Sequence, residues 1–398
     1  MKILWVNSNF MHPTNKGGSI RTLEMLLHLS KRHEIHYAAI EDPALPEGPG
    51  RAHEYSFRHY SSRNFVPERG SAAFGWQVLQ GLVSSLPLAM KRYQSPELGK
   101  SLAELLRTGN FDRAVVDHLT PATYYPDIRH ALLFQHNVET MIWRRRAEHA
   151  GTPLHKYYME LQARRMYRFE RSVCQAAGHI VAVSAVDADM MRRLFGVSNI
   201  TEIPTGVNLE YHAPQRTSHA TDLVFVGSMD WLANVDGVLW FVREVLPLIR
   251  RGRPECRVTI AGRKPPREIV ELSAADPRIV VTGTVPDVRP YLWGAAASIV
   301  PLRIGGGTRL KIYESMAAKV PIVSTTIGAE GLEAKNGENI LLADSAEDFA
   351  ARCLSLLESP DERARIAGSA WEMVRSRFSW DRVACCFEEA LEKTPRPE

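Results

Sequence analysis

Residues 301–316 read Pro-Leu-Arg-Ile-Gly-Gly-Gly-Thr-Arg-Leu-Lys-Ile-Tyr-Glu-Ser-Met, and this stretch decides how the second half of the chain folds. The apolar run Ala296–Leu302 predicts a buried strand, and the glycines after it predict a turn into a helix. Thr308 is a natural N-cap, because its hydroxyl oxygen can accept a hydrogen bond from the first turn. A strand, a glycine-rich turn and a helix in succession indicate one unit of a parallel α/β fold.

The charges at the start of this helix are opposite to the usual preference. Arg309 and Lys311 fall in the first turn, where the helix dipole favours carboxylates. Two cations there are explained if an anion binds, since glycine N–H groups and a helix end can hold a phosphate. Glu314 shares a face with Lys311 and is placed to accept hydrogen bonds from a ribose. The predicted phosphate cradle consists of Gly305, Gly306, Gly307 and Thr308. A flexible turn with a solvated basic helix end is the alternative.

The composition is typical of a globular protein with full cores. The chain has 398 residues, 45% hydrophobic and 24% charged, which is enough for two domains. A net charge of +4 is too small to indicate nucleic acid but is compatible with anionic substrates or an anionic membrane surface. Five cysteines without Cys-x-x-Cys spacing predict neither disulfides nor zinc, so we expect a reducing, cytoplasmic compartment. No apolar run approaches the roughly 20 residues of a membrane span.

Strand and helix patterns alternate from end to end, which predicts two doubly wound domains whose ligands bind at the carboxyl ends of the strands. The polar segment 209–221 is the predicted linker between an N-terminal domain, 1–208, and a C-terminal domain, 222–379. Residues 41–75 show no clean periodicity and are predicted to form irregular loops. The other predicted strands are Lys2–Asn7, Ile35–Ile40, Arg113–Asp117, Ala131–Gln135, His179–Val183, Ile200–Ile203, Leu223–Val226, Arg257–Ala261, Ile279–Thr282, Val320–Ser324 and Ile340–Leu342.

The C-terminal half resembles the donor domain of GT-B glycosyltransferases of family GT4. The segments that carry this resemblance are Phe225-Val226-Gly227-Ser228-Met229-Asp230-Trp231 with Asn234 and Asp236, Val281–Val288, the glycine-rich stretch 301–317 and Val320–Thr325. Ile203–Val207 resembles the family's crossing into the linker. In the N-terminal half, the Gly17-Gly18 loop and Phe134-Gln135-His136-Asn137 match family segments. The resemblance covers nearly the whole chain and is weaker between residues 41 and 130.

The resemblance implies two Rossmann-like domains that face a central cleft, the first for the acceptor and the second for the donor. It implies that the final helix, 380–398, crosses back to the N-terminal domain. The implied reaction is a retaining transfer of a sugar from a nucleotide-sugar to a glycan or lipid-linked acceptor, with UDP-sugars favoured over GDP-sugars. Neither a metal nor a cofactor is implied, because basic side chains and helix ends carry the leaving-group charge. A non-catalytic GT-B binding module, or another reaction such as epimerisation of a sugar nucleotide, stays open.

The resemblance also implies roles at the donor side. Glu314 matches the second glutamate of the family's Glu-x7-Glu motif and would bind the ribose. The first glutamate would fall at Gly306 and is absent, so backbone groups of the three glycines would have to replace it at the donor sugar. Arg309 and Lys311 are the predicted diphosphate ligands. The turn Gly227-Ser228 lacks the cation that many family members carry there. Arg263-Lys264, after the next strand, would supply this charge or would be a solvated turn.

His136 is the predicted catalytic residue of the N-terminal half, where the family places a histidine near the donor phosphate and sugar. It would stabilise leaving-group charge or orient the sugar, since retention by front-face attack needs no base from the enzyme. The Gly17-Gly18 loop would approach the donor phosphate or the acceptor. Asp117-His118 would contact an acceptor hydroxyl. The arginine-rich helices within 141–177 would be solvated or would lie on an anionic membrane surface.

Overall fold

The computed structural model describes residues 1–14, 17–43, 45–63, 76–78, 81, 84–148, 152–215, 217–219, 221–304 and 310–397. The chain forms two compact units, which are described separately. Unit 1 consists of Met1–Thr205 and Val383–Glu398, and unit 2 consists of Gly206–Arg382. The last helix, α17 (Trp380–Glu392), therefore begins in unit 2 and continues in unit 1.

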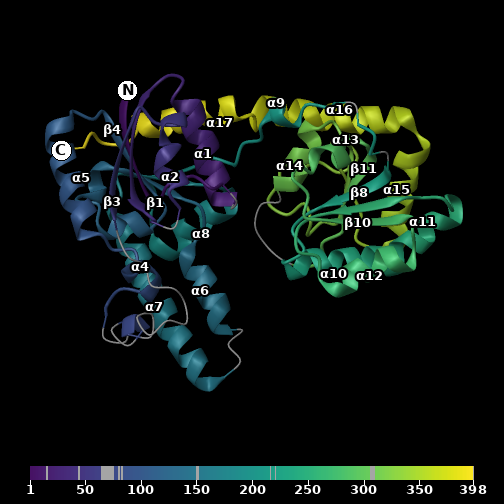
Figure 1. Cartoon of the computed structure of the whole chain (residues 1–398), viewed down its shortest axis with the longest axis horizontal. Helices are drawn as coiled ribbons and strands as arrows, with labels where there is room; N and C mark the ends of the chain where they lie inside the picture. The colour runs from purple at the N-terminus through teal and green to yellow at the C-terminus, as the bar shows by residue number, and fades with distance from the viewer. Residues whose placement is uncertain are drawn as a thin grey trace. The chain divides into compact units, whose positions relative to one another are not determined.

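Unit 1 is built on a seven-stranded parallel sheet with the order β3-β2-β1-β4-β5-β6-β7 (Figure 1). Its strands are β1 (Lys2–Asn9), β2 (Glu34–Glu41), β3 (Arg58–Arg63), β4 (Arg113–Asp117), β5 (Leu132–Gln135), β6 (His179–Ala182) and β7 (Ile200–Glu202). The run Ile3-Leu4-Trp5-Val6 of the central strand β1 is fully buried. A continuous buried run is typical of a parallel strand that helices cover on both faces.

Helices flank this sheet, and two of them extend beyond it. The longer helices are α1 (Gly17–Leu29), α5 (Pro96–Gly109), α6 (Glu139–Glu148), α7 (Pro153–Ala176) and α8 (Ala185–Phe195). Short helical turns are α2 (Glu47–Gly50), α4 (Leu88–Lys91), η1 (Ala52–Glu54), η2 (Thr120–Thr123) and η3 (Ile128–His130). Leu98 and Leu102 of α5 share a buried cluster with Leu4 and Val6 of β1. Helices α6 and α7 pack against each other and extend away from the sheet (Figure 1).

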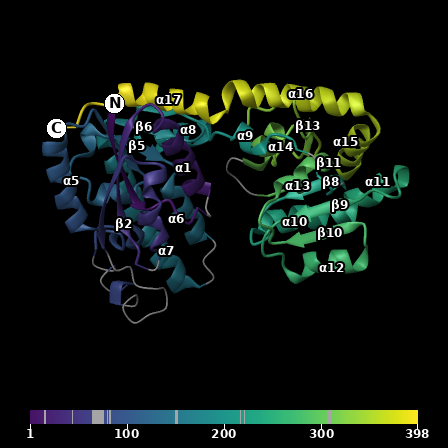
Figure 2. The same cartoon turned by 45° about the horizontal axis from the view of Figure 1, so that its top comes forward.

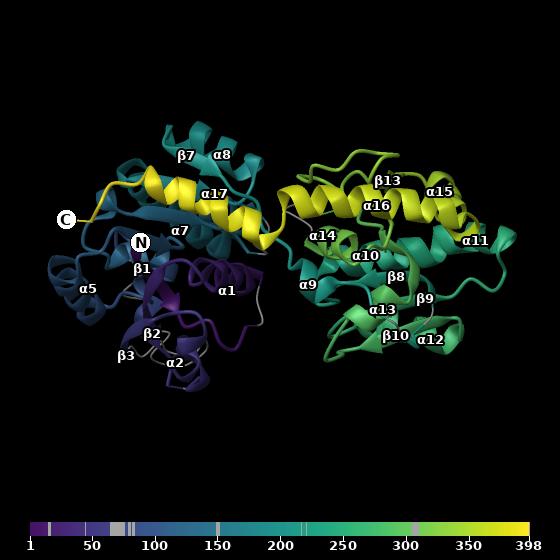
Figure 3. The same ribbon diagram turned by 90° about the horizontal axis from the view of Figure 1, so that it is seen from above.

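The C-terminal part of α17 packs on the opposite face of the same sheet. The ring of Phe387 stacks on Trp5 with a centroid distance of 5.4 Å and lies 5.1 Å from the ring of Phe134. Arg32, just after α1, pairs with Glu388 at 2.8 Å. Figures 2 and 3 show α17 crossing unit 1 beside α1 and α8.

Unit 2 contains a six-stranded parallel sheet with the order β10-β9-β8-β11-β12-β13. Its strands are β8 (Thr221–Val226), β9 (Val258–Ala261), β10 (Ile279–Gly283), β11 (Ala295–Val300), β12 (Ile322–Ser324) and β13 (Leu341–Leu342). Its helices are α9 (Leu209–His212), α10 (Leu232–Trp240), the π-helical turn η4 (Phe241–Val245), α11 (Leu246–Gly252), α12 (Arg267–Ala275), α13 (Arg289–Trp293), α14 (Leu310–Ala317), α15 (Ala346–Glu358) and α16 (Pro360–Arg377). Phe225 and Phe349 belong to the core on one face, and Val300 and Ile312 to the core on the other.

The predicted α/β architecture of two parallel-sheet, Rossmann-like units is confirmed, but one strand was missed. Strand β3 lies within residues 41–75, which the sequence predicted to be irregular. Its sequence, Arg-His-Tyr-Ser-Ser-Arg, is polar because β3 is an edge strand and most of its side chains are exposed. Residues 64–75 of this segment lie outside the described residues. In the described part of the chain, no helix has both the length and the apolar character that crossing a bilayer requires.

Replacing Phe387 by alanine removes the ring on which Trp5 and Phe134 pack. We expect the Phe387→Ala change to lower the free energy of unfolding by about 3–5 kcal/mol. Urea denaturation, with amide exchange of β1 to localise the loss, measures the effect. Glu389→Ala, at an exposed position of α17, is the matched control and should stay within about 0.5 kcal/mol of the wild type. Equal stability of the two variants would contradict the packing of α17 on unit 1.

Candidate active site

A buried carboxylate lies at the carboxyl end of β4 in unit 1. Asp117 has no exposed surface. Its Oδ2 accepts hydrogen bonds from Trp5 Nε1 at 3.1 Å, Asn7 Nδ2 at 2.7 Å and Thr22 Oγ1 at 2.8 Å. These donors come from β1 and α1, and the parallel pairing of β1 with β4 brings them to the carboxylate. The predicted contact of Asp117 with an acceptor does not fit this burial, because protein donors surround it.

His136 follows β5 and faces the other oxygen of the carboxylate. Its Nε2 lies 2.8 Å from Asp117 Oδ1, and its Nδ1 lies 3.2 Å from Arg21 Nη1. A carboxylate can only accept a hydrogen bond and a guanidinium can only donate one. The ring therefore carries its proton on Nε2 and accepts at Nδ1. These two partners hold His136 in a single neutral tautomer.

The electrostatics of the pair agree with this assignment. Burial lowers the pKa of His136, and His118 and Arg21 lower it further against the attraction of Asp117. Burial alone would raise the pKa of Asp117, but His136 and the neighbouring donors outweigh burial and lower it. At neutral pH the pair is therefore a carboxylate and a neutral imidazole. Such a pair is better suited to holding side chains in place than to transferring protons.

His118 and Gly18 complete the cluster. The ring of His118 stacks on that of His136, with centroids 3.8 Å apart and planes 23° apart. The backbone of His118 has φ of 69°, a left-handed conformation that costs energy and is enriched at functional sites. A Cβ at Gly18, in the first turn of α1, would lie 3.6 Å from both rings. The side chain of His118 keeps 34% exposure, so solvent or a ligand can reach it.

Arg21 is a candidate that the sequence analysis did not include among its site residues. Its Nε donates to Thr205 Oγ1 at 2.6 Å and its Nη1 to His136, while no acceptor among the described residues takes the Nη2 hydrogens. Burial lowers its pKa to about 10, so it stays cationic at neutral pH. A signal was present, because Arg21 follows Gly17-Gly18 into a helix just as Arg309 follows the glycines of the other half.

Asp117, His118 and His136 offer ligand atoms that lie within 4.8 Å of one another, which raises the question of a metal ion. A metal would have to displace the 2.8 Å hydrogen bond between His136 Nε2 and Asp117 Oδ1. The remaining oxygen of Asp117 already accepts three hydrogen bonds. Hydrogen bonding therefore accounts for the arrangement of the three side chains.

In unit 2, the loops after β8 and β9 meet at the carboxyl edge of the sheet. A Cβ on Gly262 would lie 1.8 Å from the carbonyl oxygen of Gly227, so only glycine allows this approach. Arg263 Nε donates to Ser228 Oγ at 2.7 Å, and its guanidinium lies 3.5 Å from Asp230. The structure thus joins the predicted residues Gly227, Ser228 and Arg263 in one group. Lys264 is exposed next to them.

Lys311, in the first turn of α14, reaches the same group. A Cβ on Gly227 would lie 2.6 Å from Lys311 Nζ, which places the ammonium directly over the glycine backbone. Nζ donates to Asn234 Oδ1 at 2.9 Å and lies 4.3 Å from the centroid of the Phe225 ring. The cation is therefore fixed at the carboxyl end of β8.

Glu314 lies one turn further along α14 and is half-buried. Burial raises the pKa of its carboxyl against the attraction of Lys311. Among the described residues, the carboxylate receives no hydrogen bond. A half-buried acceptor to which the described residues donate no hydrogen bond fits a ligand that brings its own hydroxyl groups. The other predicted donor residues, Gly305, Gly306, Gly307, Thr308 and Arg309, lie outside the described residues.

Two family profiles match the chain. Glycosyltransferase Family 4 matches residues 16–211, and Glycosyl transferases group 1 matches residues 220–359. A Klebsiella pneumoniae protein described as an uncharacterized 44.6 kDa protein in the cps region is 21% identical over 393 residues, which cover 96% of this chain and 97% of that protein. Glycogen synthase of Mycobacterium tuberculosis is 24% identical over 254 residues, which cover 59% of this chain and 60% of the synthase.

Among solved structures, HepE of Anabaena in complex with UDP superposes with a TM-score of 0.66. The match covers 98% of this chain and 100% of HepE at 12% identity. Identity this low supports a shared fold of two Rossmann-like units and nothing finer.

The pKa of His136 predicts how acid affects stability. Its pKa in the folded protein lies below the value of about 6.5 in an unfolded chain. Just below that pH the unfolded chain binds more protons, so the free energy of unfolding falls as the pH is lowered. The amide of the His136→Gln variant can still donate to Asp117. We expect this variant to show a smaller slope of unfolding free energy against pH, by the equivalent of up to about one bound proton. Urea denaturation between neutral pH and the onset of acid unfolding measures it. An unchanged slope in His136→Gln, or an equal change in the exposed control His53→Gln, would contradict the burial of a neutral His136.

Proposed function

The chain belongs to the group 1, family 4 glycosyltransferases with the GT-B fold, and from this premise we propose a retaining, metal-independent hexosyltransferase that uses a nucleotide-sugar. The observation that carries the proposal is the ammonium of Lys311 held over the backbone of Gly227, with the carboxylate of Glu314, which receives no hydrogen bond from the described residues, one turn away. The short helix α14 thus carries both a fixed cation that could bind a phosphate and a carboxylate that could accept hydrogen bonds from sugar hydroxyls.

Unit 2 would hold the donor. Lys311 and Arg309 would stabilise the charge that develops on the leaving diphosphate, with Arg263 and Lys264 as further cations of the adjoining loop. Glu314 would accept hydrogen bonds from the ribose. The backbone of Gly305, Gly306 and Gly307 would contact the donor sugar, where the family's first glutamate is missing.

A UDP-sugar is the donor we favour. Support comes from HepE, whose structures with UDP and with UDP-glucose share the fold of this chain over 98% of its length. A GDP-sugar is the competing donor. We propose a glycan or a lipid-linked glycan as the acceptor, bound by unit 1 in the cytoplasm or at the inner face of the membrane.

In unit 1, we assign contact with substrate to Arg21 and His118, and positioning to Asp117 and His136. No acceptor among the described residues takes the Nη2 hydrogens of Arg21, and His118 is the partly exposed ring of the cluster. His136 fixes the guanidinium of Arg21 through Nδ1 and is itself fixed by Asp117 through Nε2. The Gly17-Gly18 turn would allow a substrate to approach these groups closely.

The reaction needs no base from these residues. The bond from the anomeric carbon to the diphosphate oxygen breaks, and the acceptor oxygen bonds to the same face of that carbon. The proton of the acceptor hydroxyl passes to the leaving phosphate oxygen, so charge and protons balance. A neutral His136 with both nitrogens engaged is consistent with this route.

Loss of the Glu314 carboxylate should weaken nucleotide binding. We expect Glu314→Ala to raise the dissociation constant of UDP by about 10- to 100-fold, because hydrogen bonds to a charged group contribute about 1.5–3 kcal/mol. Calorimetric titration with UDP, GDP and ADP, each with magnesium and with EDTA, measures affinity, base preference and metal dependence together. The control is Glu330→Ala, at an exposed position. Unchanged UDP affinity in Glu314→Ala would refute the ribose contact, and abolition by EDTA would refute metal independence.

Arg21 should affect turnover more than nucleotide affinity. We expect Arg21→Gln to lower kcat for transfer or donor hydrolysis by about 10- to 100-fold, with Arg21→Lys intermediate because it keeps the charge but not the planar fork. The dissociation constant of UDP should stay within twofold of the wild type, since the proposed nucleotide site lies in unit 2. Arg192→Gln, on the surface of α8, is the control. Normal kcat in Arg21→Gln would remove Arg21 from the substrate site.

A further inference from the structure

Helices α6 and α7 of unit 1 border a hollow of about 690 Å³ that the proposed chemistry does not use. Five of its lining side chains are cations, namely Arg144, Lys156, Arg164, Arg168 and Arg171. A second hollow of about 550 Å³, lined by α7 and residues 84–86, shares Arg164 and Arg168 with the first. These two arginines therefore border both hollows, which are open to one elongated ligand.

The described residues leave most of this positive charge without a neutralising partner. Arg164, Arg168 and Arg171 follow one another at helical spacing on α7 and are exposed. Arg164 lies 3.9 Å from Glu160, a long surface ion pair, and no acceptor among the described residues binds the guanidinium of Arg168 or Arg171. Two carboxylates, Glu148 and Glu160, face five cations in the first hollow.

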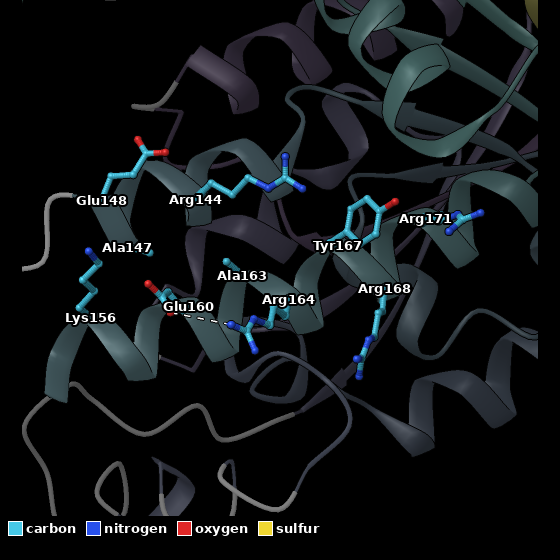
Figure 4. A pocket seen from close by; sticks show the side chains of 10 residues that line it. All are labelled: Arg144, Ala147, Glu148, Lys156, Glu160, Ala163, Arg164, Tyr167, Arg168 and Arg171. Carbon is cyan, nitrogen blue, oxygen red and sulfur yellow. Dashed lines mark ion pairs between the residues drawn. The ribbon is translucent and has the colours of Figure 1, made fainter. Parts of the chain in front are cut away.

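Both carboxylates of the first hollow lie away from Tyr167, and the cation Lys156 lies at their end (Figure 4). Figure 4 shows Arg144, Arg168 and Arg171 around Tyr167 at one end, and Glu148 near the other. Arg144 lies over the ring of Tyr167, 5.6 Å from its centroid, which fixes one cation at that end. A ligand with its negative charges toward Tyr167 would match this distribution.

We propose that this arginine groove binds an acidic glycan chain, a sugar polymer bearing carboxylates, as an extended subsite for the acceptor. Arginine forks bind carboxylates in a bidentate manner, and successive guanidinium groups on one helix face suit successive charged sugars. The proposal rests on the proposed function, in which unit 1 receives a glycan. The new element is that the glycan is acidic and that α6 and α7 bind it.

A lipid surface is the rival occupant. Leu154 and Tyr157, near the start of α7, are 80% and 68% exposed and could enter a bilayer interface. The arginines, however, line a concave surface, which a glycan chain can follow and a flat bilayer cannot. Glu148 and Glu160 would also face an anionic bilayer with like charge. The observations therefore favour a chain in the groove.

The test compares R168Q/R171Q with the charge-matched control R243Q/R251Q, which removes two exposed arginines of unit 2. Fluorescence anisotropy with labelled hexagalacturonate measures binding to the full chain at low and moderate salt. We expect binding that weakens with salt, is roughly tenfold weaker in R168Q/R171Q, and is unchanged in the control. Maltohexaose, which is neutral, should not compete. UDP titration of the wild type tests the proposed function, and an unchanged UDP affinity in each double variant shows that the variant is folded.

Equal hexagalacturonate affinity in the two double variants, or no binding by the wild type, would overturn the arginine groove while UDP binding stands. Sedimentation with phosphatidylglycerol vesicles that is lost in R168Q/R171Q, without hexagalacturonate binding, would assign the groove to lipid instead. Failure of the wild type to bind any nucleotide would refute the proposed function without bearing on the groove.

Discussion

The buried charge of Asp117 is the constraint on which the carboxyl edge of unit 1 depends. A buried carboxylate is tolerated only when donors surround it, because its desolvation is otherwise very costly. Four side chains meet that need, from Trp5, Asn7, Thr22 and His136. Phe387 of α17 stacks on Trp5, so the last helix of the chain supports the same carboxylate through the indole. In this unit, the packing of the core therefore also determines the geometry of the candidate site.

In unit 2 the charge that lies over the backbone is positive. A lysine ammonium lies where the loops after β8 and β9 approach each other. Gly227 and Gly262 allow two loops to touch, and Lys311 lies over the first of them. The groups that hold its ammonium include an amide oxygen of Asn234 and the ring of Phe225, and neither carries a charge that would cancel it. Asn234 and Phe225 thus help to hold the ammonium without adding an opposite charge.

The sequence predicted the fold well where strands are buried on both faces, because such strands read as continuous apolar runs. It missed β3, whose exposed edge position leaves no pattern to detect. It placed His136, Asp117 and Gly227 correctly at strand ends, yet it could not show that Asp117 is inaccessible. Burial and hydrogen bonding there depend on residues about a hundred positions apart, such as Trp5 and Asp117, which only the pairing of β1 with β4 brings together. The tautomer of His136 and the position of Arg21 follow from the same long-range contacts.

The charges of the described residues are consistent with the retaining transfer that we propose. Stabilising a leaving diphosphate calls for fixed cations, whereas a proton-transfer residue near them would compete for the same charge. In the proposed reaction Lys311 of unit 2 would supply such a cation, and within unit 1 the proximity of Arg21 and His118 helps to keep His136 neutral. Glycine at position 306 removes one further carboxylate from the sequence that follows β11. In the donor site that we propose, Lys311 would add a cation, and the sequence has a glycine at position 306 in place of an acid. Selection of the acceptor in the proposed reaction would also use contacts away from the reacting bond, and the proposed arginine groove of α6 and α7 would supply such contacts to an acidic glycan.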